Sequence, residues 1–321
     1  MLATIMLLGI TSIVSPATAL DTTREKELQA SIAKLTNDIE ENPQSADHYV
    51  IRGHAYRALG KYDLALKDYD QALKLGTKSS YVDECYEGRG TCYLKLNKLN
   101  EAMADFNKAL KLDPGLFEAR KGRAAALLRL GRPQETAAEI TGMLAHHKRD
   151  SSLYLSRARA LSAMRQYDRA LADVKMAASV NKDDMYVPLE GARVYLALRQ
   201  PQMALAYLNS DHKKCSGMGE YWALMSLSHY SLGQFQNTVN EANKAKDLGY
   251  QNADLLAAAA DSSARLGHND EAVSFATSAV GLNPNNAMAL YVRGQCWKKL
   301  KRDDLAKEDL QKAASLGYAP K

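Results

Sequence analysis

The sequence contains few cysteines, and none is placed to form a disulfide. Its four cysteines are Cys85, Cys92, Cys215 and Cys296. Cys85 and Cys92 lie on one predicted helix, about 10.5 Å apart at a rise of about 1.5 Å per residue, which exceeds the roughly 7 Å Cα separation that a disulfide allows. Cys215 has no evident mate. We therefore expect four free thiols, at least two of them small core residues, and no disulfide framework.

Proline and aromatic residues are also scarce. The 321 residues include 8 prolines and 7% aromatics, whereas 46% are hydrophobic and Ala, Leu and Lys are abundant. This composition contains too much apolar residue for a disordered chain and favours an all-helical, soluble protein.

Sequence motifs for catalysis are missing. The chain has no glycine-rich phosphate loop, no nucleophile elbow and no acid pair on a shared helix face. Its loop candidates are His146 beside His147, His212 near Cys215, and Asp183 beside Asp184. None of them has the spacing that would bring three metal ligands together. We expect no enzymatic activity, no cofactor and no metal.

The N-terminus lacks charge from residue 2 to residue 20. An apolar stretch up to Val14, a break at Pro16 and the triplet Ala17–Ala19 predict a secretory signal peptide over residues 1–19. No cysteine lies near the cleavage site, so we do not expect a lipoprotein. The alternative is an uncleaved membrane anchor through residues 2–20. We expect an exported protein, periplasmic or extracellular, and no later segment is apolar enough to cross a bilayer.

A 34-residue period runs through the rest of the chain. When Gly53 holds place eight of a 34-residue frame, small residues hold that place in every later repeat: Gly90, Ala124, Ala158, Ala192, Ser226, Ala260 and Gly294. The first step is 37 residues, with the insertion near 77–80, and the other six are 34. A period of this length predicts a solenoid of stacked units. The repeats start near 46, 83, 117, 151, 185, 219, 253 and 287.

Each repeat reads as two helices. Places four, eight and eleven form one helix face, as in Tyr49, Gly53 and Tyr56. Glycines then predict a left-handed stop at place fifteen in four repeats: Gly60, Gly131, Gly233 and Gly267. A second helix follows, with a compact residue at place twenty such as Ala65 or Ala102. Short turns make such pairs antiparallel.

Segments such as RGHAYRALGKYDLALKDYDQAL (52–73) resemble tetratricopeptide repeats, and the resemblance covers residues 46–316. It implies an all-α fold, a right-handed superhelical solenoid of eight helix–turn–helix repeats over 46–321. Residues 20–45 would form an N-terminal capping helix. The resemblance also implies that the first helices line a concave groove where peptides bind, and that the fold alone does not name the partner.

The repeats contain an internal Arg–acid pattern. Five repeats have Arg at place seven and an acid at place twenty-three: Arg52 and Asp68, Arg89 and Asp105, Arg123 and Glu139, Arg157 and Asp173, Arg293 and Asp309. In the other three repeats the Arg is replaced, and the acid persists only as Glu241. We expect a structural salt bridge between the two helices of each such repeat. The alternative makes the arginines ligand contacts.

Charge is distributed unevenly along the chain, whose net charge is +5. Residues 117–218 contain 17 basic and 10 acidic residues, a net +7, whereas 219–286 contain 3 and 7, a net −4. Frame places five, nine and thirteen are expected to face the groove, and in repeats three to five they supply Lys121, Arg129, Arg159 and Arg193. This stripe predicts a site for an acidic peptide, or else a solvated basic face. Aromatic residues do not interleave with it, so we expect no nucleic acid partner.

Two irregular places remain. Residues 209–219 in the fifth repeat read as a loop, which indicates a degenerate repeat or a hinge. The second helix of the last repeat is not covered by a following helix. Either its outer side is polar enough to face solvent, or this end docks a partner or another copy. Two functions follow: an exported, non-enzymatic scaffold that binds a protein or peptide in its groove, or an accessory subunit of an envelope or secretion assembly held by its ends.

Overall fold

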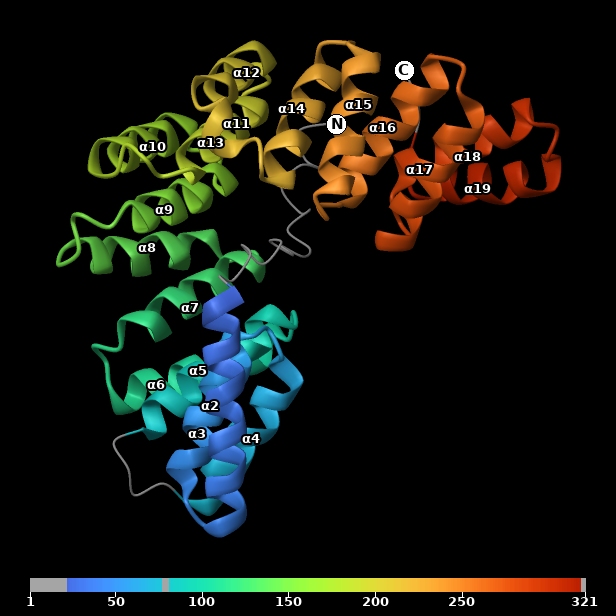
Figure 1. Ribbon diagram of the computed structural model, residues 1–321. Coiled ribbons are helices and arrows are strands. Elements are labelled where there is room, and N and C mark those ends of the chain that lie inside the picture. Colours follow the sequence, from blue (N-terminus) through green and yellow to red (C-terminus); the bar gives the residue numbers. More distant parts are fainter. Residues whose placement is uncertain (1–21, 77–80, 319–321) are drawn as a thin grey trace. The chain divides into compact units, whose positions relative to one another are not determined.

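The computed structural model describes residues 22–76 and 81–318, and all regular structure in that part of the chain is helical (Figure 1). The predicted signal peptide at 1–19 and the insertion at 77–80 lie outside the described residues. The expected all-helical fold of successive helix pairs is confirmed. No helix among residues 22–76 and 81–318 combines the length and the apolar character needed to span a membrane.

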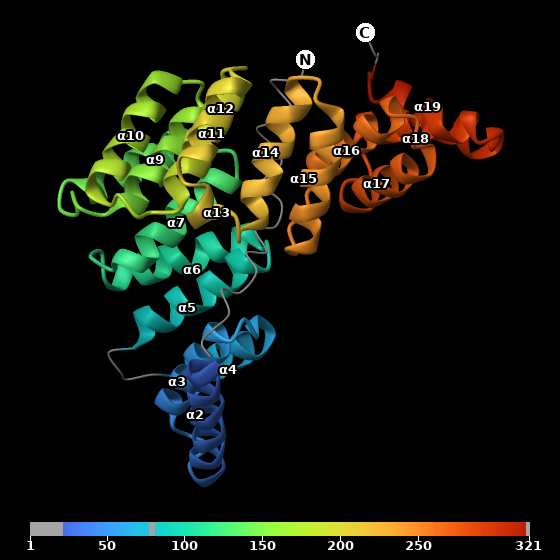
Figure 2. The same cartoon turned by 45° about the horizontal axis from the view of Figure 1, so that its top comes forward.

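The chain divides after Gln166 into two compact units, which we call the first unit and the second unit. Figure 2 shows their helices from a second direction. The first unit contains α2 (Thr22–Glu41), α3 (Ala46–Ala58), α4 (Tyr62–Leu75), α5 (Val82–Lys95), α6 (Leu99–Leu112), α7 (Phe117–Arg129), α8 (Pro133–Leu144) and α9 (Ser151–Ala163). The second unit contains α10 (Tyr167–Val180), α11 (Tyr186–Ala197), α12 (Pro201–Ser210), α13 (His212–Cys215), α14 (Gly219–Ser231), α15 (Phe235–Asp247), α16 (Ala253–Arg265), α17 (Asn269–Leu282), α18 (Ala287–Lys299) and α19 (Asp303–Ser315).

Left-handed residues end the first helix of each repeat. The four predicted glycine stops are confirmed, with φ of 71° at Gly60, 74° at Gly131, 71° at Gly233 and 86° at Gly267. The other four repeats use the same conformation without glycine, at Asn97, Arg165, Arg199 and Lys301. A non-glycine residue in this region costs roughly 1–2 kcal/mol, so the geometry of the turn prevails over the local preference.

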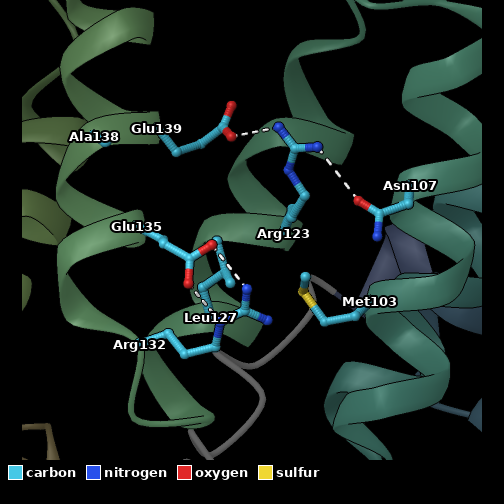
Figure 3. A pocket seen from close by; sticks show the side chains of 8 residues that line it. All are labelled: Met103, Asn107, Arg123, Leu127, Arg132, Glu135, Ala138 and Glu139. Atoms are coloured by element: carbon cyan, nitrogen blue, oxygen red, sulfur yellow. Dashed lines mark hydrogen bonds and ion pairs between the residues drawn. The ribbon is translucent and has the colours of Figure 1, made fainter.

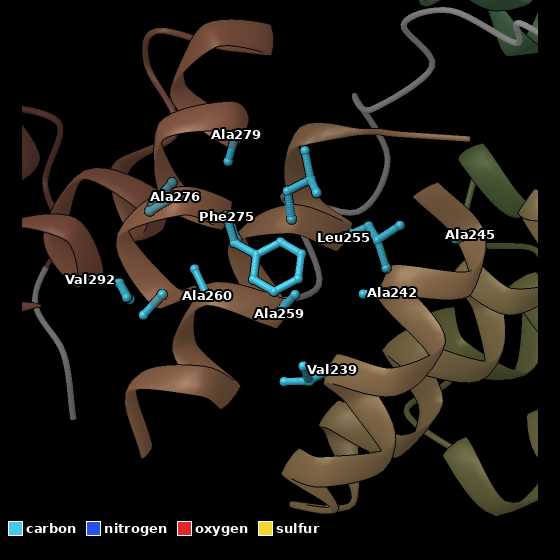
Figure 4. Close-up of a cluster of buried hydrophobic side chains, with 14 of the residues drawn as sticks. Val239, Ala242, Ala245, Leu255, Ala259, Ala260, Phe275, Ala276, Ala279 and Val292 are labelled. Carbon is cyan, nitrogen blue, oxygen red and sulfur yellow. The ribbon is translucent and has the colours of Figure 1, made fainter. Parts of the chain in front are cut away.

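Small residues let the paired helices approach closely. The alanines at place twenty, Ala65 and Ala102 among them, are fully buried. In the second unit the core continues through α15, α16 and α17, where the Phe275 ring lies beside Ala259 and Ala260 (Figure 4). Phe275 holds the place that an acid holds in the Arg-containing repeats, so apolar packing replaces the ion pair there.

Two aromatic rings of the first unit pass from one repeat into the next. Tyr69 of α4 and Phe106 of α6 are fully buried. A Cβ added to Gly88 would lie 2.5 Å from the Tyr69 hydroxyl, and one added to Gly122 would lie 2.4 Å from Phe106 Cζ. Each glycine therefore leaves the space that the ring of the preceding repeat fills.

The ends of the array differ in how they are covered. Helix α2 packs against α3 and buries Leu35 and Ile39. Helix α19 buries Ala306 and Ala313, while Leu316 after it is 41% exposed.

The fifth repeat corrects one expectation. Residues 209–219 do not form a continuous loop, because α12 runs to Ser210 and a short helix, α13, follows. The break falls at Asp211, whose φ of −134° is not helical. His212 and Cys215 then anchor the segment, the first through Tyr221 Oη at 2.8 Å and the second by full burial. The boundary between the compact units lies after Gln166, not in this segment.

Candidate functional site

The first helices of the first three repeats lie beside each other in the first unit, and those of the last four repeats do so in the second unit. We call the surface formed by frame places two, five, nine and thirteen of these helices the first-helix face. The sequence predicts partner binding at places five, nine and thirteen of this surface. In the first unit it belongs to α3, α5, α7 and α9, and in the second unit to α11, α14, α16 and α18.

The Arg and acid side chains of four repeats are in contact inside their own units. Arg52 Nε and Nη2 each lie 2.8 Å from an Asp68 carboxylate oxygen. Arg293 makes the same two bonds to Asp309 at 2.7 Å. The pairs Arg89–Asp105 and Arg123–Glu139 are also formed. Arg157 and Asp173 belong to different units, and their pairing stays a prediction.

Each of these arginines also donates to the preceding repeat. The acceptor is a polar residue at place twenty-five, or the corresponding position of α2, and it receives the Nη1 group: Thr36 from Arg52 at 3.1 Å, Asp70 from Arg89 at 2.6 Å, Asn107 from Arg123 at 3.3 Å, Thr141 from Arg157 at 3.2 Å and Thr277 from Arg293 at 3.5 Å. One guanidinium therefore joins three helices. The sequence-based prediction did not include this contact. An oxygen-bearing side chain at place twenty-five was the feature that could have indicated it.

Tyrosines flank the guanidinium groups in the first two repeats. Arg52 lies over the rings of Tyr49 and Tyr56, at 5.7 and 5.8 Å from their centroids. Arg89 lies over Tyr86 and Tyr93 in the same way. These ring contacts and the bidentate hydrogen bonds engage the guanidinium groups within the fold. A ligand is therefore not needed to explain why the arginines are present.

The four residues of the predicted basic stripe have different surroundings. Lys121 is half-buried, and its Nζ lies 5.5 Å from the Phe117 ring centroid. Arg129 donates to the Leu94 carbonyl at 2.7 Å and to Asn97 Oδ1 at 2.7 Å. Burial lowers the pKa of Arg129. Arg129 therefore supports the end of α5.

The other two arginines of the stripe are half-buried. Arg159 lies on α9 in the first unit, and Arg193 lies on α11 in the second unit. Arg193 donates to Glu190 at 3.1 Å and forms an ion pair with Glu220 of the next repeat. Both carboxylates reduce its availability to an acidic ligand.

A polar cluster that the sequence reading did not identify lies between the first two repeats. The Tyr69 hydroxyl contacts His54 Nδ1 at 2.8 Å. Burial, with a smaller effect of Arg57, lowers the pKa of His54 to about 4, so this imidazole is neutral at pH 7. Glu87 accepts bonds from Arg57 at 3.2 Å and Thr91 at 2.8 Å, and its burial raises its pKa. The sequence feature that could have indicated this cluster is Tyr69, because the other repeats have an aliphatic residue or Phe at the same place.

In the second unit the first-helix face is acidic and aromatic. Asp261 of α16 accepts bonds from Tyr230 Oη at 2.9 Å and Arg265 Nε at 2.6 Å. The rings of Tyr291 and Tyr318 are in contact, with centroids 5.2 Å apart. Burial raises the pKa of Tyr318, and the nearby Asp261 charge adds to this effect.

A cavity of about 420 Å³ lies between α6, α7 and α8, outside the first-helix face (Figure 3). Its charged lining residues pair with each other, Arg123 with Glu139 and Arg132 with Glu135. Hydrogen bonding to Arg132 lowers the pKa of Glu135. Because the two pairs cancel, the cavity does not favour a ligand of either charge.

The loop residues considered as catalytic candidates have local contacts. The His147 ring packs on Phe117, with centroids 4.5 Å apart. Asp183 pairs with Lys214 at 2.8 Å, which lowers the pKa of Asp183. All four cysteines are free and buried, as expected. No group of three His, Cys, Asp or Glu side chains in residues 22–76 and 81–318 is arranged to bind a metal.

Two models of the tetratricopeptide repeat match the sequence, over residues 44–115 and 88–145. They match residues 44–145, and paired helices continue through the rest of the described chain. The chain contains tetratricopeptide repeats (TPR). A search of curated proteins found no match to this TPR protein.

Solved structures share its fold at low identity. One chain of the APC/C hetero-tetramer Cut9–Hcn1 has a TM-score of 0.56 and 14% identity over 84% of this TPR protein, which spans 66% of that chain, just under two thirds. A TPR protein from Parabacteroides merdae has a TM-score of 0.51, 16% identity and coverage of 74% and 93%. PilW, a type IV pilus biogenesis factor, has a TM-score of 0.52, 21% identity and coverage of 65% and 91%. These likenesses concern the fold alone.

Proposed function

We propose that this TPR protein is an exported, non-enzymatic scaffold that binds a protein or peptide partner on its first-helix faces. The observation that carries the proposal is the contrast between the charged side chains on these faces and the Arg–acid pairs. The Arg–acid pairs are used inside the fold, whereas Lys121 at place five and Asp261 at place nine are charged groups of the first-helix faces, and the partners of Asp261, Tyr230 and Arg265, belong to the same unit. Export rests on residues 1–19 as a signal peptide. The fold shared with a pilus biogenesis factor is compatible with a role in the cell envelope.

On the first unit we propose an acidic partner segment that meets Lys121, with Arg159 on the neighbouring first helix. Lys121 is the residue to test, because reversing Arg129 or Arg193 would also break contacts that support the fold. Its ammonium group has no carboxylate within ion-pair distance among the described residues. A carboxylate of the partner would supply a charge-assisted hydrogen bond.

The experiment is affinity purification of the full chain from its native compartment with mass spectrometry, comparing wild type with Lys121→Glu. The matched control is Lys111→Glu, an exposed lysine on the second helix α6. We expect Lys121→Glu to lose partners that Lys111→Glu retains. A full partner set with Lys121→Glu would reject this face as the binding site and favour the alternative, an accessory subunit held by its ends, where Leu316 is exposed.

Cleavage of the leader is tested separately. We expect mass spectrometry of the mature protein to find an N-terminus at Leu20, and a mature protein that retains residues 1–19 would favour a membrane anchor.

A further inference from the structure

Acids at frame place two approach the residue at place nine of the preceding repeat on the first-helix face. Glu84 Oε2 lies 3.9 Å from His54 Nε2 at the first junction. At the junction between α11 and α14 the contact is a full ion pair, Arg193 with Glu220. The side chain of Glu220 is only 12% exposed in that pair. His54 is neutral at pH 7, so among these two junctions it is Arg193 that supplies a cation at place nine for the acid of the next repeat.

The next junction keeps the acid and lacks the cation. Leu227 and Asp254 stand 34 residues after Arg193 and Glu220, so they hold the same two places on α14 and α16. The Asp254 carboxylate accepts a hydrogen bond from Asn286 Nδ2 at 3.4 Å. Among residues 22–76 and 81–318 no Lys, Arg or His lies within ion-pair distance of Asp254. Burial raises the pKa of this carboxyl, as expected for an acid without a cation.

The neighbourhood of Asp254 favours positive charge from outside. Residues 219–286 contain 7 acidic and 3 basic residues. Asp261 lies two helical turns further along α16, beside the Tyr230 hydroxyl. Leu227 is half-buried, and an apolar residue at that place offers a surface to the methylene stem of a long basic side chain.

We propose that Leu227 and Asp254 form a recognition site for a lysine or arginine side chain of a basic partner segment, which takes the place that the Arg193 guanidinium takes opposite Glu220. The site rests on the proposed function as a protein-binding scaffold and names the chemistry of one partner segment. The carboxylate of Asp254 accepts hydrogen bonds from the incoming ammonium or guanidinium group, and Leu227 packs against its aliphatic part.

The test uses the full chain and labelled hexalysine and hexaarginine peptides, with hexaglutamate as the opposite charge, in fluorescence anisotropy at low ionic strength. Asp254→Asn keeps the shape and the bond to Asn286 and removes the charge. Asp270→Asn, an exposed acid in the first turn of α17, is the matched control. We expect Asp254→Asn to weaken binding of the basic peptides about tenfold, or about 1.4 kcal/mol, because a hydrogen bond to a charged group is stronger than one to a neutral group. Asp270→Asn is expected to have little effect.

Leu227→Arg tests the internal template. The new guanidinium should pair with Asp254 as Arg193 pairs with Glu220, so we expect a higher melting temperature and loss of basic peptide binding. Combining it with Asp254→Asn should remove the gain in melting temperature. If Leu227→Arg does not fold, Asp254→Asn still decides the question.

Two outcomes overturn the proposal. One is equal affinity of wild type and Asp254→Asn for both basic peptides, and the other is an equal loss with Asp270→Asn, which would indicate general electrostatic attraction only. Neither outcome bears on the Lys121 experiment, because Lys121 belongs to the other unit. Failure of this site and failure of the scaffold function are therefore distinguishable.

Discussion

A double-mutant cycle on Arg89 and Asp105 measures what the Arg–acid pairs contribute to folding. The Asp105 side chain is 3% exposed and accepts bonds from Arg89 Nε at 2.6 Å and Nη2 at 2.8 Å. Arg89→Ala would leave this carboxylate buried without a cation, which costs about 3–5 kcal/mol of unfolding free energy. Asp105→Ala should cost less, roughly 1.5–3 kcal/mol, because Arg89 is more exposed and keeps its bond to Asp70.

The double variant removes both charges and therefore leaves no unpaired one. We expect its loss to be smaller than the sum of the single losses by about 1–3 kcal/mol. The measurement is urea denaturation at 25 °C followed by circular dichroism. The raised pKa of Arg89, caused mainly by its hydrogen bonds to Asp105, indicates the same coupling. Single losses that add to within about 0.5 kcal/mol would refute the reasoning.

The exposed pair Arg132–Glu135 is the control for this cycle. Its side chains are 47% and 56% exposed although its atoms are 2.6 Å apart. Solvent screens such a pair, so we expect no measurable coupling there. Equal coupling in both cycles would show that contact distance, not burial, determines the contribution.

Three further predictions concern single sites. Burial raises the pKa of Asp254, so between its ordinary and its raised pKa the folded state binds more protons than the unfolded state. In urea titrations the wild type should therefore gain stability relative to Asp254→Asn as the pH falls from 7 toward 4. A difference in unfolding free energy that does not change with pH would contradict this. Cys85 and Cys92 have a pKa raised by burial to about 12, so they should not react with a thiol reagent at pH 8 until urea unfolds the protein. Gly122→Ala should cost about 1–3 kcal/mol in thermal or urea unfolding, because its Cβ would overlap the Phe106 ring, and Phe106→Leu in the same chain should recover part of the loss; an unchanged stability would show that the ring shifts freely.

The 34-residue period predicts the helix pairs well because each repeat buries side chains at the same frame places. Glycine at place fifteen predicts the left-handed stops at Gly60 and Gly131, whereas Arg165 and Arg199 adopt the same conformation without any local signal. There the packing of the two helices, not the residue, determines the turn. Variation among repeats within one chain predicted four of the pairs that join the two helices of a repeat, and the pairing of Arg157 with Asp173 stays a prediction.

The candidate site was less predictable, because its contacts join residues about one repeat apart. Arg129 was predicted to face a ligand, yet its partners include the Leu94 backbone carbonyl, which carries no side-chain signal. Arg193 was assigned to a basic stripe, and its neutralising acid Glu220 lies in the next repeat. The place of a residue in the 34-residue frame predicts which way its side chain points. It does not predict which charged group of a neighbouring repeat lies opposite.

The rings that pass between repeats have a consequence for how this array was built and how it can be rebuilt. Tyr69 requires Gly88, and Phe106 requires Gly122, although each glycine belongs to the following repeat. The fourth repeat has Ser156 at the corresponding place and follows Ile140, a smaller residue. Repeats one to three are therefore not interchangeable modules. A duplication, deletion or designed shuffle would preserve the packing only if each ring kept the glycine that follows it and also the small residue at place eight of its own repeat, Gly53 for Tyr69 and Gly90 for Phe106.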